Sequence, residues 1–198
     1  MTAKINNGKI NCILISGKAH SGKDTVADLL ALYLPEFGLD SVQTSHLAVG
    51  IKSMATTFCG WDGVKDAKGR KLLQDFGEAF RSYDVDVWTK HMLTQVESRV
   101  FLPNVLLVPD WRYEAERDFI MGLPLYNVIS VRVENSSSPT LEGDAATHIS
   151  EHGLRPVVGS DLSGYIYDYL IVNDSRDDSF DTLLESVFNL IDGLVVDL

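Results

Sequence analysis

A glycine-rich stretch near the start of the chain constrains the fold more than any other feature of the sequence. Its nine residues, Gly17–Thr25, have the sequence GKAHSGKDT and follow a short apolar run at Ile10–Ser16. A short apolar run bounded by glycines is typical of a buried parallel strand. After the stretch, apolar residues recur at helical spacing until Pro35 ends the pattern. The sequence therefore predicts a strand, a glycine-rich loop and a helix in direct succession.

The glycines and the lysine of this stretch suit a phosphate-binding loop. Gly17 and Gly22 allow backbone amides to curve around phosphate oxygens at the start of a helix. Lys23 would reach the β- and γ-phosphates of a nucleoside triphosphate, while the side chain of Lys18 could either cover the phosphates or point to solvent. The residues expected to bind the triphosphate here are Gly17, Lys18, Ala19, Ser21, Gly22, Lys23, Asp24 and Thr25.

The residue that follows Lys23 departs from the usual motif. A Ser or Thr normally occupies this place and binds Mg²⁺, but here Asp24 comes first and Thr25 one place later. Mg²⁺ keeps several waters and takes only one or two protein oxygens. We therefore expect Thr25 to bind the ion directly, and Asp24 or Asp110 to act through water.

Strands and helices alternate along the rest of the chain. The predicted strands are Ile10–Ser16, Ser41–Ser45, Asn104–Val108, Tyr126–Val133 and Leu170–Val172. The predicted helices after the first are Leu47–Phe58, Arg70–Arg81, Asp86–Phe101, Glu114–Met121 and a last helix with an apolar face from Phe180 to Ile191. This alternation predicts a three-layer α/β fold whose five-stranded parallel sheet is covered by helices on both faces.

The length of 198 residues suits one domain, residues 1–198, with a single buried core. Within it, the helices at about 47–101 are expected to bind an acceptor molecule. The polar stretch at about 134–155 suits a short flap over the site better than a linker between domains. Ligands of parallel sheets bind at the carboxyl ends of the strands, so functional residues should follow the strands.

A carboxylate and a guanidinium follow the third predicted strand. Asp110 ends this strand, and it could either bind Mg²⁺ through water or orient the attacking oxygen of an acceptor. Arg112 comes two residues later, where it could form two parallel hydrogen bonds with a phosphate. The alternative is an Asp–Arg pair on the surface of a loop. The candidate catalytic residues are Lys23, Asp110 and Arg112.

Basic residues and a tryptophan gather between the second and third predicted strands. Lys52, Arg70 and Arg81 supply positive charge that the chain otherwise lacks, and Trp88 could pack against a base. Taken singly, such arginines are usually solvated, and such a tryptophan more often belongs to the core. Their clustering predicts a binding site for a small anionic acceptor.

The charge of the chain limits its partners. A formal net charge of −11 argues against a general nucleic-acid-binding protein, which needs clustered Lys and Arg to displace counterions from phosphates. The first eleven residues lack the apolar stretch of a signal peptide, and no run approaches the ~18 apolar residues of a membrane span. We therefore expect a cytoplasmic protein whose partners are small molecules, with a homodimer left open.

Six blocks of the sequence together resemble the bacteriophage-type deoxynucleoside monophosphate kinases. They are ISGKAHSGKDT (Ile15–Thr25), LAVGIK (Leu47–Lys52), GRKLLQDFG (Gly69–Gly77) with Trp88, VPDWRYEAE (Val108–Glu116), HISEHGL (His148–Leu154) and IVND (Ile171–Asp174). The phosphate loop is common to many kinases, whereas the order of the last three blocks is more specific. The resemblance implies a three-layer P-loop kinase fold, and the host cytoplasm if a phage encodes the chain.

The resemblance also implies a reaction and a set of site residues. The reaction is transfer of phosphate from ATP, bound with Mg²⁺, to deoxynucleoside monophosphates, which become diphosphates. Carried over by position, the residues around the acceptor are Lys52, Arg70, Gln74, Trp88, Asp110, Arg112 and Glu116, with His148, Ser150 and Glu151 on the flap. Arg81 joins them as a basic residue of the same segment. Arg132 and Asn173 would lie near ATP.

Some features leave the substrate open. The stretch NSSSPTLEGDAAT contains no Arg or Lys. Related kinases use basic flap residues to neutralise the transferring phosphate, so Arg132, Arg155 or another group must supply this charge. The alternatives are a kinase for another small phosphorylated acceptor, of the phosphomevalonate or dephospho-coenzyme A type, and a nucleotide-binding switch without an acceptor.

Overall fold

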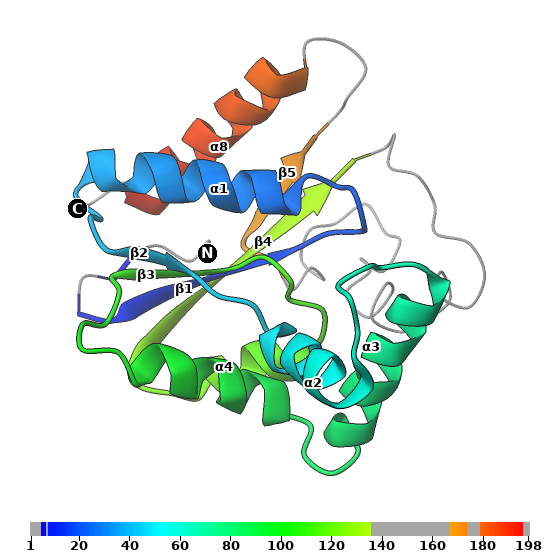
Figure 1. Cartoon of the computed structure of the whole chain (residues 1–198). Helices are drawn as coiled ribbons and strands as arrows, with labels where there is room; N and C mark the ends of the chain where they lie inside the picture. The colour runs from blue at the N-terminus through cyan, green and yellow to red at the C-terminus, as the bar shows by residue number, and fades with distance from the viewer. Residues whose placement is uncertain (1–4, 7, 136–166, 174–178, 196–198) are drawn as a thin grey trace.

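A parallel sheet forms the centre of the computed structural model, which describes residues 5–6, 8–135, 167–173 and 179–195 (Figure 1). Within these residues the sheet has five strands in the order β2-β3-β1-β4-β5. The strands are β1 (Ile10–Ser16), β2 (Val42–Thr44), β3 (Val105–Val108), β4 (Tyr126–Glu134) and β5 (Tyr169–Val172). The predicted α/β fold with a five-stranded parallel sheet is confirmed.

Helices cover both faces of this sheet, as predicted. They are α1 (Lys23–Tyr33), α2 (Val49–Cys59), α3 (Ala67–Arg81), α4 (Val87–Glu97), α5 (Glu114–Met121) and α8 (Ser179–Val195), with a short 3₁₀ helix at Leu34–Phe37. Helices α1 and α8 lie on one face, and α4 lies on the other (Figure 1). Helices α2 and α3 pack against each other beside the sheet, with α3 farthest out. None of the described helices is both long enough and apolar enough to span a lipid bilayer.

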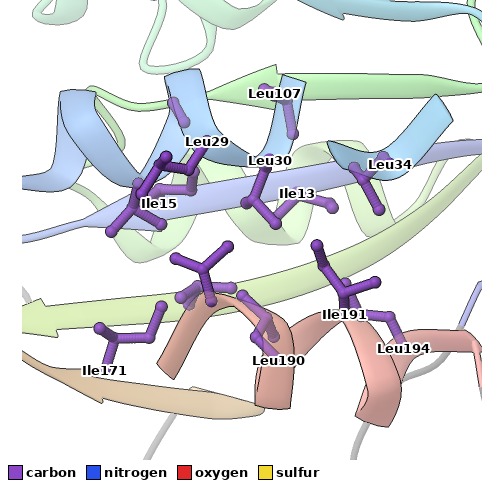
Figure 2. Packing of buried hydrophobic residues seen from close by; sticks show 14 of the residues in the cluster. Ile13, Ile15, Leu29, Leu30, Leu34, Leu107, Ile171, Leu190, Ile191 and Leu194 are labelled. Carbon is purple, nitrogen blue, oxygen red and sulfur yellow. The ribbon is translucent and has the colours of Figure 1, made fainter. Parts of the chain in front are cut away.

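Every residue of strand β1 is buried. Successive side chains of a strand point to opposite sides, so alternate residues of β1 belong to the clusters on the two faces of the sheet. Ile13 and Ile15 contact the cluster formed with α1 and α8, where Leu30 and Ile191 also lie (Figure 2). On the other face, Cys12 and Leu14 belong to the cluster that α4 and α5 complete. Burial of one such aliphatic side chain contributes roughly 1.5–3 kcal/mol. The sheet is therefore a rigid base for the loops at its carboxyl edge.

The position of β1 in the middle of the sheet places the glycine-rich loop at the centre of this edge. The chain passes from β1 to β2 on one side, returns to β3 beside β1, and continues to β4 on the opposite side. Ligands of open parallel sheets bind at such a reversal of strand order. The loop after β1 and Asp110 after β3 both lie there.

Several boundaries differ from those predicted; helix α3, for example, begins at Ala67, three residues before the predicted Arg70. Helix α4 was expected to reach Phe101 but ends at Glu97, because Val96 is its last buried apolar residue and the Ser98 hydroxyl donates to the carbonyl of Gln95. Helix α2 begins at Val49, two residues later than predicted. Most of the predicted flap, from residue 136 to 155, lies outside the described residues.

Candidate active site

The glycine-rich loop has the backbone that phosphate binding requires. Gly22 precedes the first residue of α1 with a φ of 92°, in the left-handed region, and Lys23 then starts the helix. At Gly17, an added Cβ would lie 2.3 Å from Oγ of Ser21 and 2.7 Å from the carbonyl oxygen of Val133. Both glycines are therefore needed for the loop to fold back on the start of α1, where its amides and the helix dipole attract anions.

Asn173, which directly follows β5, holds the glycine-rich loop through hydrogen bonds. Its side-chain amide donates a hydrogen bond of 3.0 Å to the carbonyl of Ser21, and its backbone N–H donates to Glu134 across the sheet at 2.7 Å. An added Cβ on Gly22 would lie 2.5 Å from the same amide nitrogen. Asn173 thus fixes the loop conformation, while its predicted contact with ATP stays a prediction.

Arg132, the other residue expected near ATP, is almost fully buried in β4. It pairs in register with Ser16, the last residue of β1. Its Nε lies 3.5 Å from Oε1 of Glu134, and its guanidinium carbon lies 5.8 Å from the ring centre of Tyr167. Arg132 is therefore next to the base of the phosphate loop, and its predicted role toward ATP stays a prediction.

Lys23 and Asp24 bring opposite charges to the start of α1. The Lys23 side chain is 13 % exposed, and its Nζ lies 3.6 Å from Oδ2 of Asp24, whose side chain is 71 % exposed. Thr25 is exposed in the same turn. The described residues hold no group of three metal-ligating side chains. One hydroxyl and one carboxylate suit Mg²⁺ if phosphates supply most of its other ligands. Thr25 and Asp24 fit such an ion.

A pocket begins at Lys23 and extends toward α2 and α3. The basic side chains that line it, among the described residues, are Lys23, Lys52, Lys65, Arg70, Arg81 and Arg112. The acidic ones are Asp24, Asp110 and Glu116. The whole chain has only 17 Lys and Arg against 28 Asp and Glu. A local excess of positive charge in so acidic a protein attracts an anion to this one place.

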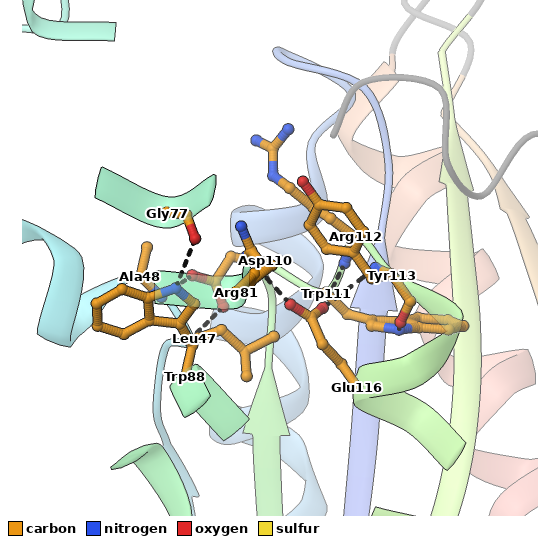
Figure 3. A network of polar contacts seen from close by, with 10 residues as sticks. All are labelled: Leu47, Ala48, Gly77, Arg81, Trp88, Asp110, Trp111, Arg112, Tyr113 and Glu116. Atoms are coloured by element: carbon orange, nitrogen blue, oxygen red, sulfur yellow. Dashed lines mark hydrogen bonds and ion pairs between the residues drawn. The ribbon is translucent and has the colours of Figure 1, made fainter. Parts of the chain in front are cut away.

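A buried carboxylate organises one wall of the pocket (Figure 3). Oε2 of Glu116 accepts hydrogen bonds of 3.1 Å from the backbone N–H groups of Arg112 and Tyr113. Glu116 is the third residue of α5, and a side chain at this place can reach back to the backbone just before the helix. Oε1 lies 3.4 Å from Nη2 of Arg81. The guanidinium of Arg81 also lies 4.2 Å from the ring centre of Tyr113. One carboxylate therefore ties α3 to the turn that carries Arg112.

Burial has the largest effect on the pKa of the Glu116 carboxyl. The residue is 2 % exposed, and burial raises the pKa of its carboxyl to about 7. The hydrogen bond from the N–H of Arg112, the charge of Arg81 and the N–H of Tyr113 act in the opposite direction, while the charge of Asp110 raises the pKa further. Glu116 was expected to bind the acceptor; it lines the pocket, but its oxygens contact the protein itself.

Asp110 holds the turn before α2. Oδ1 and Oδ2 accept hydrogen bonds of 2.9 Å each from the backbone N–H groups of Leu47 and Ala48 (Figure 3). Nδ1 of His46 lies 3.9 Å from Oδ2. Each carboxylate oxygen keeps a second lone pair, so the predicted part of Asp110 in metal binding or in orienting the acceptor is compatible with this geometry and stays a prediction.

Trp88 does not reach the pocket, although it was expected to pack against a base. It is 3 % exposed, and its Nε1 donates a hydrogen bond of 3.1 Å to the carbonyl of Gly77 in α3. Its ring centre lies 5.3 Å from that of Phe80, and an added Cβ on Gly50 would lie 3.0 Å from its ring. The pocket is lined instead by another aromatic residue, Tyr113. Trp88 therefore joins α2, α3 and α4, as the alternative of a core tryptophan predicts.

The structure brings most of the other expected acceptor residues together and adds some that the sequence did not indicate. Lys52, Arg70, Gln74, Arg81 and Arg112 line one pocket. His148, Ser150 and Glu151 lie outside the described residues. The lining residues that sequence reasoning missed are His46, Leu47, Ala48, Ile51, Lys65, Leu73 and Tyr113. Only the charge of Lys65, within the basic segment, was a signal that could have identified it.

No protein-family model matches the chain, and no curated protein matches it. Among solved structures, an APS kinase from Mycobacterium tuberculosis is 15 % identical, with a TM-score of 0.44, over 93 % of this chain and 98 % of that one. A thymidylate kinase from Ehrlichia chaffeensis is 13 % identical with a TM-score of 0.45, over 94 % and 99 % of the two chains. A gluconokinase from Sinorhizobium meliloti is 13 % identical with a TM-score of 0.44, over 96 % and 97 %. Likenesses this distant say nothing about the substrate of this chain.

Proposed function

We propose that the chain is a kinase that transfers the terminal phosphate of ATP to a deoxynucleoside monophosphate and so forms a diphosphate. The observation that carries this proposal is the pocket whose six basic side chains begin at Lys23 of the phosphate loop. A loop that cradles a triphosphate explains one of these charges. Arg81 pairs with Glu116, but the pocket still has more basic than acidic side chains, and this excess suits a second anion beside the first, which is what a phosphorylated acceptor supplies.

On the donor side, the loop amides and Lys23 hold the β- and γ-phosphates of ATP. Mg²⁺, when bound, neutralises charge on these phosphates, and Thr25 with Asp24 would hold it. Lys23 is suited to its part because its side chain is largely buried and faces the pocket. A positive charge held away from bulk water stabilises developing negative charge more strongly than one in solvent.

On the acceptor side, Arg112 and Arg81 hold the acceptor phosphate. A phosphate with two charges and three oxygens suits a planar guanidinium, which donates two parallel hydrogen bonds. Glu116 positions both arginines, since it pairs with Arg81 and fixes the backbone at Arg112. Gln74 lies in the same pocket with the apolar residue Leu73, so an amide and an apolar surface are available for a sugar and a base.

In the transfer, an oxygen of the acceptor phosphate forms a bond with the γ-phosphorus of ATP, and the bond from that phosphorus to the leaving ADP oxygen breaks. Phosphoryl transfer of this kind needs positioning and charge neutralisation more than proton transfer. The described pocket offers several fixed positive charges and no histidine beyond His46. This composition suits the reaction proposed.

The test is ADP formation by the purified chain with ATP, Mg²⁺ and one candidate acceptor at a time. The panel contains the deoxynucleoside monophosphates, the matching ribonucleotides, phosphomevalonate and dephospho-coenzyme A. We expect ADP to form only when a nucleoside monophosphate is present. ADP release without any acceptor would indicate a regulatory ATPase instead, and turnover with only a non-nucleotide acceptor would indicate a different small-molecule kinase. Lys23→Ala serves as the control for contaminating kinases.

A further inference from the structure

The segment between α2 and α3 is a tightly bonded loop that points a lysine into the pocket. Nε1 of Trp61 donates a hydrogen bond of 2.9 Å to the carbonyl of Val64, and the N–H of Val64 donates to Oδ1 of Asp62 at 3.0 Å. Gly63 has a φ of 92°, which allows the turn to close. The backbone on the N-terminal side of Lys65 is therefore fixed by contacts within the loop.

The C-terminal side of Lys65 is fixed by helix α3. Oδ1 of Asp66 accepts a hydrogen bond of 2.7 Å from the N–H of Gly69 and so caps the helix. An added Cβ on Gly69 would lie 2.2 Å from the carbonyl oxygen of Val64, so the first turn of α3 packs directly on the loop. The backbone of Lys65 is thus held on both sides by local hydrogen bonds and packing.

The charge of Lys65 has no counterion among the described residues. It lines the pocket, and it makes no hydrogen bond or ion pair within the described part of the chain. Burial lowers the pKa of its ammonium group, and neighbouring positive charges lower it further. These charges belong, in order of effect, to Lys52, Arg70, Lys23 and Arg112. Lys65 is exposed at the edge of the pocket, so its ammonium group is accessible to an anion that enters there.

We propose that Lys65 binds the phosphoryl group in transit, between the donor phosphates at Lys23 and the acceptor phosphate at Arg112. The reason for this place is that Lys65, Lys23 and Arg112 line the same pocket. This inference rests on the proposed kinase function. It also identifies a basic group, outside the flap, that can neutralise the transferring phosphate.

The chemistry required of Lys65 is electrostatic. As the bond from the γ-phosphorus to ADP breaks and the bond to the acceptor oxygen forms, negative charge spreads over the three equatorial oxygens. The ammonium group donates hydrogen bonds to these oxygens and keeps its proton throughout. A contact that strengthens in the transition state raises kcat more than it lowers KM. Lys65 is therefore a catalytic residue in this proposal.

The kinetic experiment compares Lys65→Gln and Lys65→Arg with the wild-type chain. Lys68→Gln is the matched control, because Lys68 is an equally exposed lysine three residues later, at the start of α3, and does not line the pocket. We expect Lys65→Gln to lower kcat by at least about tenfold with small changes in both KM values, Lys65→Arg to recover part of the rate, and Lys68→Gln to behave as the wild type. A Lys65→Gln variant with a wild-type kcat would overturn the inference.

A binding experiment separates this inference from the proposed function. The probes are inorganic tripolyphosphate, long enough to span donor and acceptor positions, and inorganic phosphate. We expect Lys65→Gln to weaken tripolyphosphate binding at least about tenfold and phosphate binding much less, with Lys68→Gln unchanged for both. If no nucleotide is phosphorylated but this pattern holds, the proposed function fails while Lys65 remains a ligand for a bridging polyanion. If nucleotides are phosphorylated and tripolyphosphate binding by Lys65→Gln is normal, only the inference about Lys65 fails.

Discussion

The glycine-rich loop proposed to bind phosphate and the pocket proposed to bind the acceptor are built in opposite ways. The loop is one continuous stretch, Gly17–Thr25, whose proposed contacts with phosphate are mostly backbone amides and whose shape depends on two glycines. The pocket collects side chains from α2, α3, the 60–66 loop and the turn after β3. Its geometry therefore depends on how separate elements pack. A continuous backbone site tolerates many side-chain changes, whereas an assembled site changes whenever one of its supports moves.

The supports of the acceptor pocket are carboxylates that face inward. Glu116 and Asp110 line the pocket, and each accepts two hydrogen bonds from backbone N–H groups, while their predicted roles toward substrate stay predictions. They thereby fix the turns that carry Arg112 and begin α2. In the phosphate loop the corresponding support is one amide, that of Asn173. Variants of these residues and of the groups they position should affect the two regions differently.

The largest effect should come from Trp88→Ala, which removes the packing between α2, α3 and α4. Loss of a fully buried tryptophan costs about 3–5 kcal/mol, and here the hydrogen bond to Gly77 is lost as well. Urea denaturation should show this loss of unfolding free energy. Tyr83→Ala is the control, because Tyr83 is 92 % exposed and its change should stay within about 0.5 kcal/mol. A fully stable Trp88→Ala that fails to use the acceptor would restore Trp88 as a binding residue.

Lys23→Ala should leave the fold intact but lower turnover by at least ~100-fold, because a charge at the transferring phosphate is lost. Circular dichroism and steady-state ADP formation measure the two parts of this expectation. Lys68→Ala is the control, since Lys68 is an exposed lysine that does not line the pocket. Near-normal ADP formation by Lys23→Ala would mean that Lys23 does not stabilise the transferring phosphate, and the glycine-rich loop would no longer be assigned to the donor.

Glu116 should make the stability of the acceptor side depend on pH. Burial raises the pKa of its carboxyl from 4.5 to about 7, so between these values the folded chain holds a proton that the unfolded chain has released. The contribution of this group to stability is therefore fully present below about pH 4.5 and falls by up to about 3 kcal/mol as the pH rises past 7.

Glu116→Gln tests this expectation, because an amide cannot ionise but keeps an oxygen that can accept the N–H groups of Arg112 and Tyr113. Its unfolding free energy should fall less than that of the wild type between about pH 5 and pH 7.5, by roughly 2 kcal/mol. Glu114→Gln, an exposed residue of the same helix, should keep the wild-type slope. Equal slopes in all three proteins would mean that Glu116 is ionised throughout this range.

The difference between the two regions also explains what could be predicted from the sequence. Strand β1 and helix α5 begin and end at the predicted residues, because apolar runs and helical spacing are local signals. The strand order and the burial of Trp88 depend on long-range packing, which periodicity does not encode. Basic residues of the pocket could be predicted by type, but the inward turn of Glu116 and the support given to Lys65 come from tertiary contacts that no short motif contains.

A loss of kcat/KM confined to the acceptor should come from Arg112→Lys, which keeps the charge and removes the planar fork. Arg112 lines the acceptor pocket and lies two residues after Asp110, in the turn that follows β3. Glu116 fixes its backbone by accepting a hydrogen bond from the Arg112 N–H. A guanidinium donates two parallel hydrogen bonds to a phosphate, whereas an ammonium acts as a point charge. Loss of one charged hydrogen bond is worth roughly 1.5–3 kcal/mol, or about ten- to a hundred-fold in kcat/KM for the acceptor.

The measurement for Arg112→Lys is steady-state kinetics with the acceptor varied at saturating ATP, beside a titration of an ATP analogue. Arg117→Lys is the control and should match the wild type, because Arg117 lies on the helix that follows Arg112, α5, and does not line the pocket. Binding of the ATP analogue should not change, because the phosphate loop is built separately from the turn that carries Arg112. If Arg112→Lys instead weakens ATP binding and spares acceptor kinetics, Arg112 belongs to the donor site, and the turn after β3 must be counted with the glycine-rich loop and not with the acceptor pocket.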